Sequence, residues 1–213
     1  DISRSEKTQR LVEILANNFQ KVEKRKPGRN LRVSLFAHDI PGTDLKLYGA
    51  WLTDANSYFR KVSHQKLSLP FASEWVLDNY YIIQQALKQI EKDLPINYYW
   101  QLPKLAAGPL KGSARIYAIA STIISFQNQT IDMVDLKNTL VEYQTRVPLT
   151  TGELWALPIF LRYGLIEFLS RTLVSIIKPS IAPHLPDVNS MLIATQDLLP
   201  DKEEAKEQTV NSH

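Results

Sequence analysis

Residues 151–177, TGELWALPIFLRYGLIEFLSRTLVSII, are the stretch that decides the fold class. Thr150 or Thr151 is placed to cap a helix here, with Glu153 in the first turn. Pro158 lies close enough to the helix start to be tolerated. The apolar run then continues to Ile177 without a further breaker. We therefore predict one long helix.

The same stretch needs a membrane check because it is strongly apolar. Arg162, Glu167 and Arg171 interrupt it. Charges spaced in this way cost several kcal/mol each at the centre of a bilayer. Glu167 and Arg171 also form an i, i+4 pair in the favourable orientation. We expect a core helix of a soluble domain and no membrane span in this chain.

Apolar residues recur at three- and four-residue steps through most of the remaining chain, and no alternation typical of strands is sustained. The prediction is an all-α helical bundle or array of about seven helices with no substantial sheet. Five other helices are expected at about Ser5–Lys26, Ser73–Asp93, Ser113–Phe126, Thr130–Arg146 and Asp187–Leu199. A further helix is expected to be capped by Thr43 or Asp44, with a buried face made by Leu45, Tyr48, Leu52, Ala55 and Phe59. The buried face of the Thr130–Arg146 helix is expected to be Met133, Leu136, Leu140 and Tyr143.

Breakers and composition divide the chain. Pro27-Gly28 is expected to end the first helix, and a loop with three prolines is expected from Leu94 to Pro109. We expect a basic N-terminal helical region (1–66) packed as one domain with a helical core (67–199), followed by a charged tail (200–213). The Asp1 start and the Ile2–Ser5 opening lack signal-peptide features, so we expect a fragment of a longer protein.

Composition excludes several function classes. The 213 residues contain no cysteine, which excludes disulfides, thiolate metal sites and a cysteine nucleophile. They contain only four histidines, which excludes most histidine-based metal sites. No P-loop, Gly-rich dinucleotide turn, nucleophile elbow or His-Glu-x-x-His helix is present. No Asp-x-Asp or Gln-x-x-Arg-Trp occurs for holding a nucleotide sugar. We expect no bound metal and no cofactor in this chain.

The near-neutral net charge of +3 hides an asymmetry. Residues 1–66 hold 13 Lys+Arg and 7 Asp+Glu, whereas residues 67–213 hold 12 and 15. The basic excess lies around the Lys24–Arg32 loop, which is suited to an anionic surface. A solvated helix end explains it more simply. With only Phe19 and Phe36 as nearby aromatics, no nucleic-acid partner is expected.

Candidate acids and bases are carboxylates. Glu74, Asp78, Glu153 and Glu167 are candidates for a catalytic pair of the kind used in glycoside hydrolysis, and Glu74, Asp78 and Glu153 are the ones carried forward as weak catalytic candidates. Glu74 and Asp78 are four residues apart, so they repel on one helix face unless a cation or a hydroxyl network lies between them. The simpler interpretation is a helix-start charge and a loop contact.

Aromatic residues offer a second kind of site. A platform on which sugar rings stack while polar groups bind their hydroxyls could be formed by two segments, Trp75-x-x-Asp78-Asn79-Tyr80-Tyr81 and Tyr98-Tyr99-Trp100. Core packing competes with this interpretation. Arg162 lies on a different azimuth from Glu153, so we expect it to pair with a neighbouring helix, at Asp78 or Glu74.

Four strings together resemble a known family. They are EWVLDNYYIIQQALKQIEKDLP (74–95), YYWQLPKLAAGPLKGSARIYAIA (98–120), VEYQ (141–144) and PLTTGELWALPIFLRYGLIEFL (148–169). In this order they resemble the N-terminal soluble segment of bacterial cyclic β-1,2-glucan synthases. The resemblance covers about Phe71 to Thr172, and it includes Trp75, Asp78, Asn79, Tyr99, Lys104, Arg115, Glu153, Trp155 and Arg162.

The resemblance implies an accessory role. Proteins of that family are large inner-membrane enzymes that join this segment to a glucosyltransferase using UDP-glucose and to a phosphorylase-like toroid. It implies a place on the cytoplasmic side of the bacterial inner membrane, with other domains of the parent chain and a β-glucan as partners. The glucan-binding candidates are Trp75, Asn79, Tyr99, Trp100, Lys104, Trp155 and Arg162.

Three functions follow, in order of preference. The first is a non-catalytic accessory domain of a glycosyltransferase, for docking or glucan-chain guidance. The second is a carbohydrate-active helical domain that uses a carboxylate pair. The third is an anionic-surface adaptor acting through the Lys24–Arg32 loop. The sequence leaves open whether this chain is catalytic by itself.

Overall fold

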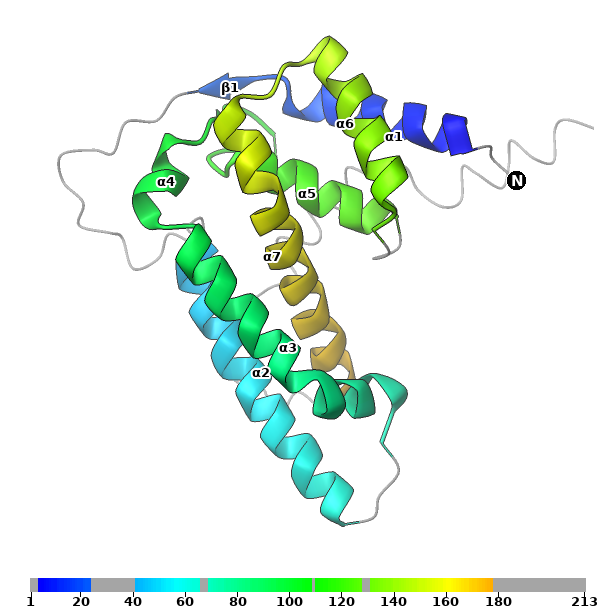
Figure 1. Cartoon of the computed structure of the whole chain (residues 1–213), viewed down its shortest axis with the longest axis vertical. Coiled ribbons are helices and arrows are strands. Elements are labelled where there is room, and N and C mark those ends of the chain that lie inside the picture. Colours follow the sequence, from blue (N-terminus) through cyan, green and yellow to red (C-terminus); the bar gives the residue numbers. More distant parts are fainter. Residues whose placement is uncertain (1–3, 24–40, 66–68, 109, 128–130, 178–213) are drawn as a thin grey trace, which may run out of the picture.

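A computed structural model describes residues 4–23, 41–65, 69–108, 110–127 and 131–177 (Figure 1). These ranges are predominantly helical, which confirms the all-α prediction. The elements in chain order are α1 (Arg4–Phe19), β1 (Val22–Glu23), α2 (Pro41–His64), α3 (Phe71–Asp93), α4 (Ile96–Gln101), β2 (Lys104–Leu105), α5 (Arg115–Phe126), α6 (Met133–Arg146) and α7 (Thr151–Ile176).

Helix α7 connects two groups of helices. It packs against α5, α3 and α2, while α1 packs against α6 and α5. In Figure 1, α2 and α3 form an antiparallel hairpin that extends away from the group made by α1, α5 and α6. The hairpin and this group therefore meet through α7.

The α5–α7 contact forms the centre of the core. Every residue from Arg115 to Ile124 is buried, as the apolar run predicts. Gly164 of α7 lets the two helices approach closely, because a Cβ atom there would lie 2.6 Å from Ile124 Cδ1. The α2 face predicted from the sequence is also confirmed, since Leu45, Tyr48, Leu52, Ala55 and Phe59 are all buried.

Helix α7 runs unbroken past Pro158. Pro158 is the eighth residue of the helix, so nearness to the start does not by itself explain its tolerance. The proline has no N–H for the carbonyl of Leu154. Leu154 and Pro158 both lie on the exposed side, where water can bind that carbonyl.

Two predictions about the ends of the first helix and the proline-containing loop are wrong. Helix α1 ends at Phe19, and Val22–Glu23 pairs as an antiparallel strand with Lys104–Leu105. The loop after Leu94 contains a short helix, α4, whose first turn is closed by hydrogen bonds from the Tyr98 and Tyr99 amides to the Pro95 carbonyl. Proline fits this position because its missing N–H would have no helical partner there.

Helix starts also differ from the prediction. Helix α2 begins at Pro41, so Thr43 and Asp44 lie inside it, and α3 begins at Phe71 rather than Ser73. Helix α6 begins at Met133, and Met133 is exposed rather than part of the buried face. Its actual cap is Asp132, whose side chain accepts hydrogen bonds from the Val134 and Asp135 amides.

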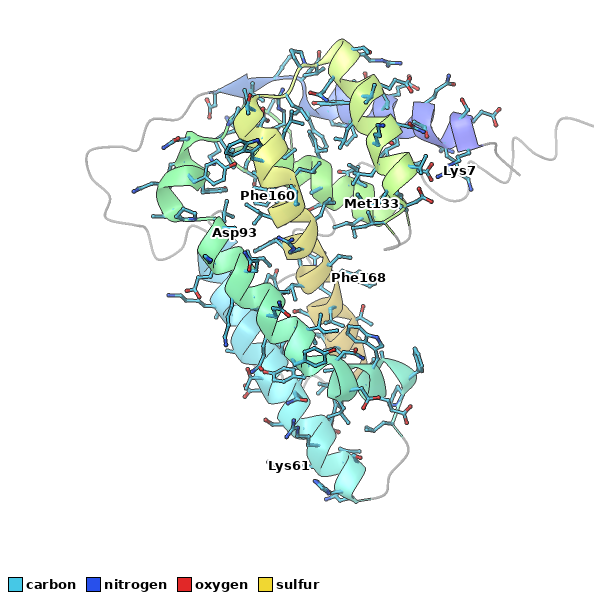
Figure 2. The ribbon with its side chains drawn as sticks, in the orientation of Figure 1. Lys7, Lys61, Asp93, Met133, Phe160 and Phe168 are labelled. Carbon is cyan, nitrogen blue, oxygen red and sulfur yellow. The ribbon has the colours of Figure 1, made fainter. Side chains whose placement is uncertain are left out.

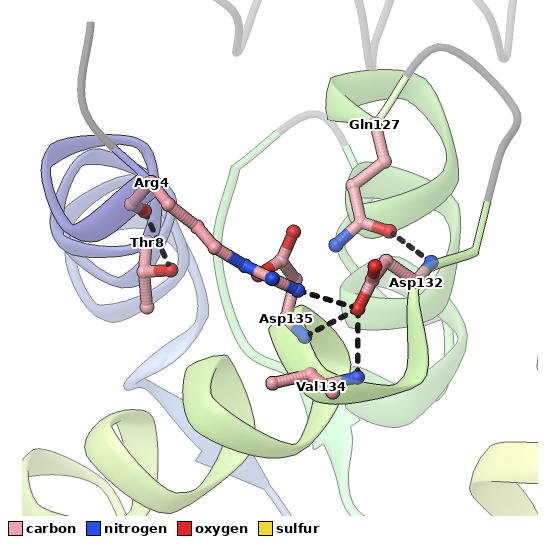
Figure 3. Close-up of polar contacts among 6 residues, drawn as sticks. All are labelled: Arg4, Thr8, Gln127, Asp132, Val134 and Asp135. Atoms are coloured by element: carbon pink, nitrogen blue, oxygen red, sulfur yellow. Dashed lines mark hydrogen bonds and ion pairs between the residues drawn. The ribbon is translucent and has the colours of Figure 1, made fainter.

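Arg4 of α1 joins this cap (Figure 3). Its guanidinium donates to Asp132 Oδ1 at 2.7 Å and also to Asp135, while the Asp132 amide donates to Gln127 Oε1 at 3.3 Å. Hydrogen bonds from the two helix amides, together with Arg4, lower the pKa of Asp132. This contact ties the start of α1 to the start of α6.

Some predicted features lie outside the described residues. They are the Pro27-Gly28 break, the Lys24–Arg32 loop, the Asp187–Leu199 helix and the tail at 200–213. Among the helices that the structure describes, none combines the length and the apolar character needed to cross a membrane.

Candidate functional site

The N-terminus of α7 is closed by a capping box. Glu153 N donates to Thr150 Oγ1 at 3.2 Å, and Thr150 N donates to Glu153 Oε2 at 2.9 Å. The capping role expected of a threonine belongs to Thr150, whereas Thr151 is the first residue of the helix. The Glu153 side chain is 0 % exposed. It is therefore held inside the protein from the first turn onward.

Arg115 of α5 completes this cluster. Its Nε donates to Glu153 Oε1 at 2.7 Å and its Nη2 to Glu153 Oε2 at 2.6 Å, which is a two-point ion pair between α5 and α7. Nη2 also donates to the Pro148 carbonyl at 3.1 Å. Burial lowers the pKa of Arg115, but Glu153 more than offsets this, so the net pKa is raised.

This geometry assigns Glu153 a structural task. Both of its carboxylate oxygens accept hydrogen bonds from Arg115 and Thr150, and none of its side chain faces solvent. A general acid or base must reach the proton that it transfers. Glu153 lacks that access, so it is excluded from the candidates for a catalytic carboxylate pair.

Lys104 is the second buried charge among the candidates. Its side chain is also fully buried; Nζ donates to the Tyr99 carbonyl at 2.6 Å and lies 3.3 Å from the Tyr99 ring centroid and 5.6 Å from that of Trp100. A cation over aromatic faces in a desolvated place is a favourable contact. Tyr99, Trp100 and Lys104 are thus brought together, but as part of the interior beneath α4.

The exposed candidates lie on the outer face of α7. Trp155 is 75 % exposed, and Pro158 and Arg162 follow it at three- and four-residue steps on the same side of the helix. Trp155 and Arg162 are seven residues apart, which is about 10 Å along the helix axis. We call Trp155, Pro158 and Arg162 the outer row. An indole and a proline ring offer flat apolar surface, and Arg162 adds hydrogen-bond donors.

The predicted partner of Arg162 is wrong. Arg162 Nη1 lies 4.0 Å from Asp93 Oδ2, and neither Glu74 nor Asp78 is its partner. Asp93 is the last residue of α3, and Figure 2 shows it beside the upper part of α7. Glu74 and Asp78 lie near the opposite end of α3, and Asp78 alone is about 22 Å away along the helix. Gln89 Nε2 donates to Asp93 at 2.7 Å and adds a further polar group beside the outer row.

The remaining candidates lie at the start of α3. Glu74 and Asp78 are exposed, Trp75 is 41 % exposed, and Asn79 donates to the Trp75 carbonyl at 2.9 Å. Trp75 is 18 residues before Asp93, which is about 27 Å along the helix. Tyr98 to Trp100 follow the other end of α3. The two aromatic groups therefore do not form the single platform considered from the sequence.

A third buried charge, Glu167, lies deeper in α7. Arg171 Nη2 donates to Glu167 Oε1 at 2.6 Å, which confirms the predicted i, i+4 pair. Tyr117 of α5 and Tyr48 of α2 donate their hydroxyls to the same carboxylate at 3.1 and 3.4 Å. Glu167 thus joins α2, α5 and α7. Burial raises its pKa, although Arg171, Tyr117 and Tyr48 act in the opposite direction.

A pH dependence follows from Glu167. Its folded-state pKa lies above the ordinary value of 4.5, so the folded protein binds this proton more tightly than the unfolded chain does. The contribution of Glu167 to stability is complete at pH values below the ordinary pKa of 4.5. It declines as pH rises from that pKa to the higher pKa of the folded state. The E167Q variant lacks this decline.

The measurement is urea unfolding of the wild type and E167Q between about pH 4 and about pH 8. We expect the free energy of unfolding of E167Q to rise relative to that of the wild type as pH rises, because only the wild type has a buried carboxyl group that must ionise. A stability difference that does not change with pH would contradict this role of Glu167.

Arg115 was not predicted from the sequence as the partner of Glu153. The signal was present, since Arg115 is the only charged residue in a helix predicted to be buried throughout. A buried charge needs a partner of opposite charge. The hydrogen bonds from Tyr117 and Tyr48 to Glu167 were not predicted either. Within the residues that the structure describes, no group of three or more His, Asp or Glu side chains could hold a metal ion.

Comparison with known proteins agrees with the resemblance inferred from the motifs. The chain is similar to the cyclic beta-(1,2)-glucan synthase NdvB of Rhizobium meliloti (strain 1021), with 32 % identity over 111 residues. The aligned part is 51 % of this chain but only 4 % of that much longer protein. No family model matches the chain. No solved structure matches it either.

Proposed function

We propose that this chain is a non-catalytic helical accessory region of a cyclic β-1,2-glucan synthase-like glycosyltransferase, and that it guides or docks the glucan chain along the outer row. The larger protein would supply the transferase chemistry and bind UDP-glucose. It would be a membrane protein, with this region on the cytoplasmic side of the bacterial inner membrane and in contact with other domains of the same chain.

One observation carries this proposal: Trp155 projects into solvent from the same helix turn in which Glu153 is buried. The string that resembles glucan synthases thus contains both residues that hold the fold and a residue that is free to bind. The similarity to a cyclic β-1,2-glucan synthase supports a glucan as the ligand. A pyranose ring can stack its C–H face on the indole, while Arg162, Asp93 and Gln89 offer polar groups that can hydrogen-bond to sugar hydroxyls further along the helix.

Replacing Trp155 tests the proposal. We expect W155A to weaken the binding of linear β-1,2-gluco-oligosaccharides about tenfold or more in isothermal calorimetry, because the stacking surface is lost. Trp155 is mostly exposed, so the variant should keep its fold, as circular dichroism would show.

The matched control is W75A, which removes a partly exposed tryptophan near the start of α3, whereas the outer row lies beside the end of that helix. We expect W75A to bind the oligosaccharides as the wild type does. Equal binding by W155A and the wild type would overturn the assignment to the outer row. Binding lost equally in both variants would mean that the effect is not local to α7.

A further inference from the structure

The face of α3 that is turned away from the core carries an ordered row of six exposed residues. They recur at alternating steps of four and three along the helix, the spacing that keeps side chains on one face. We call Glu74, Asp78, Tyr81, Gln85, Lys88 and Lys92 the α3 stripe. The packed face of the same helix is marked by Val76, Ile83 and Ile90.

Charge is separated along the stripe. Its first half carries Glu74 and Asp78, and its second half carries Lys88 and Lys92. Each like-charged pair has i, i+4 spacing, which is mildly unfavourable in an isolated helix. Within the described residues none of the four charges forms an ion pair. The helix dipole explains Glu74 and Lys92 in the terminal turns, but its effect does not reach Asp78 and Lys88.

An antiparallel copy of the same helix complements this pattern. When two stripes are aligned in opposite directions, Glu74 lies opposite Lys92, Asp78 opposite Lys88, and Tyr81 opposite Gln85. A two-fold axis repeats each contact, so every like-charged pair acquires two opposite charges. A parallel alignment would instead place acids against acids and lysines against lysines.

Apolar side chains are also exposed at the centre and along one flank of the stripe. Tyr81 is 66 % exposed, Phe71 is 81 % exposed, and Trp75 and Ile82 are each exposed by about two-fifths. Self-complementary surfaces with an apolar part and ordered charges are typical of two-fold interfaces. The polar ends of such a surface set its direction and register.

We propose that two copies of this chain associate through the α3 stripe, antiparallel and about a two-fold axis. The α3 stripe shares no residue with the outer row of α7, and its test measures self-association rather than glucan binding. The occupant of the stripe is a second copy of the chain, selected by the order of its charges.

Reversing half of the stripe tests the proposal. The double variants K88E/K92E and E74K/D78K give all-acidic and all-basic stripes, and both should be monomeric in sedimentation velocity at concentrations at which the wild type is dimeric. The expected weakening of self-association is at least tenfold for each. An equimolar mixture of the two variants should restore the dimer. The dissociation constant of the wild type should rise with salt.

The mixture separates loss of the interface from loss of the fold, since two misfolded variants would not rescue each other. The control K7E/K137E changes the net charge by the same amount as K88E/K92E at exposed positions on α1 and α6, and it should remain dimeric. A wild type that is monomeric throughout the concentration range would overturn the proposal. So would a dimer that both charge reversals leave intact, or a mixture that stays monomeric.

Discussion

Replacing Glu153 with alanine should lower the free energy of unfolding by about 3–5 kcal/mol. The Arg115 side chain is only 4 % exposed, and its guanidinium would keep its charge without the carboxylate that neutralises it. The α7 capping box would be lost in the same step. Urea unfolding followed by circular dichroism gives this free energy directly.

Two further variants divide the effect. T150A removes the capping hydroxyl alone and should cost about 1 kcal/mol. The double variant R115M/E153L replaces both charges with apolar groups and should be less destabilised than E153A, because no unpaired charge remains buried. A loss below about 1 kcal/mol for E153A, the range of an exposed ion pair, would contradict the structural role assigned to Glu153.

Replacing Phe160 with alanine should cost about 3–5 kcal/mol. Phe160 is fully buried on α7, with its ring centroid 5.8 Å from that of Tyr117 on α5 and 6.5 Å from that of Tyr99 on α4. Its removal would leave a cavity between three helices. Because Tyr99 also packs under Lys104, we expect the α4 region to loosen together with the core, seen as faster amide exchange there.

Phe168 provides the matched control on the same helix. Both phenylalanines are marked in Figure 2, but Phe168 is only partly buried. F168A should therefore cost distinctly less than F160A in the same urea experiment. Equal losses would mean that Phe160 is no more central to the core than Phe168.

The predictable part of the fold is what local sequence determines. The apolar run at 113–126 predicted the buried helix α5, and the face from Leu45 to Phe59 predicted the packed side of α2. A threonine cap at Thr150 or Thr151 with Glu153 in the first turn was predicted, and Thr150 is the one that caps. The spacing of Glu167 and Arg171 predicted their ion pair. Each of these features depends on residues a few positions apart in the chain.

Local sequence left the exact helix starts and the short helix α4 undetermined, and the other missed features depend on residues far apart in sequence. Arg115 and Glu153 are 38 residues apart. The two-residue strands β1 and β2 are too short for alternation to be visible, and only their pairing defines them. Arg162 was assigned to the wrong end of α3, because sequence spacing does not show how two helices lie against each other. The sequence likewise could not show that α3 separates Trp75 from the other aromatic residues.

The candidate site residues also fall into a group that the sequence could identify and a distinction that it could not make. The resemblance identified Lys104, Glu153, Trp155 and Arg162 together, but only burial distinguishes their tasks. Lys104 and Glu153 lie inside and hold helices in place, while Trp155 and Arg162 lie outside on the outer row. Burial depends on the whole fold, so a motif alone could not separate the residues that support the surface from those that form it.

The most direct measurement of the central claim is a titration of the chain with linear β-1,2-gluco-oligosaccharides, followed by tryptophan fluorescence. A β-1,4-linked series and UDP-glucose serve as comparisons. We expect saturable binding of the β-1,2 series alone, with a change in the tryptophan emission spectrum that is absent in W155F. A flat response to the β-1,2 series, or equal binding of the β-1,4 series, would contradict a glucan-guiding role for this chain.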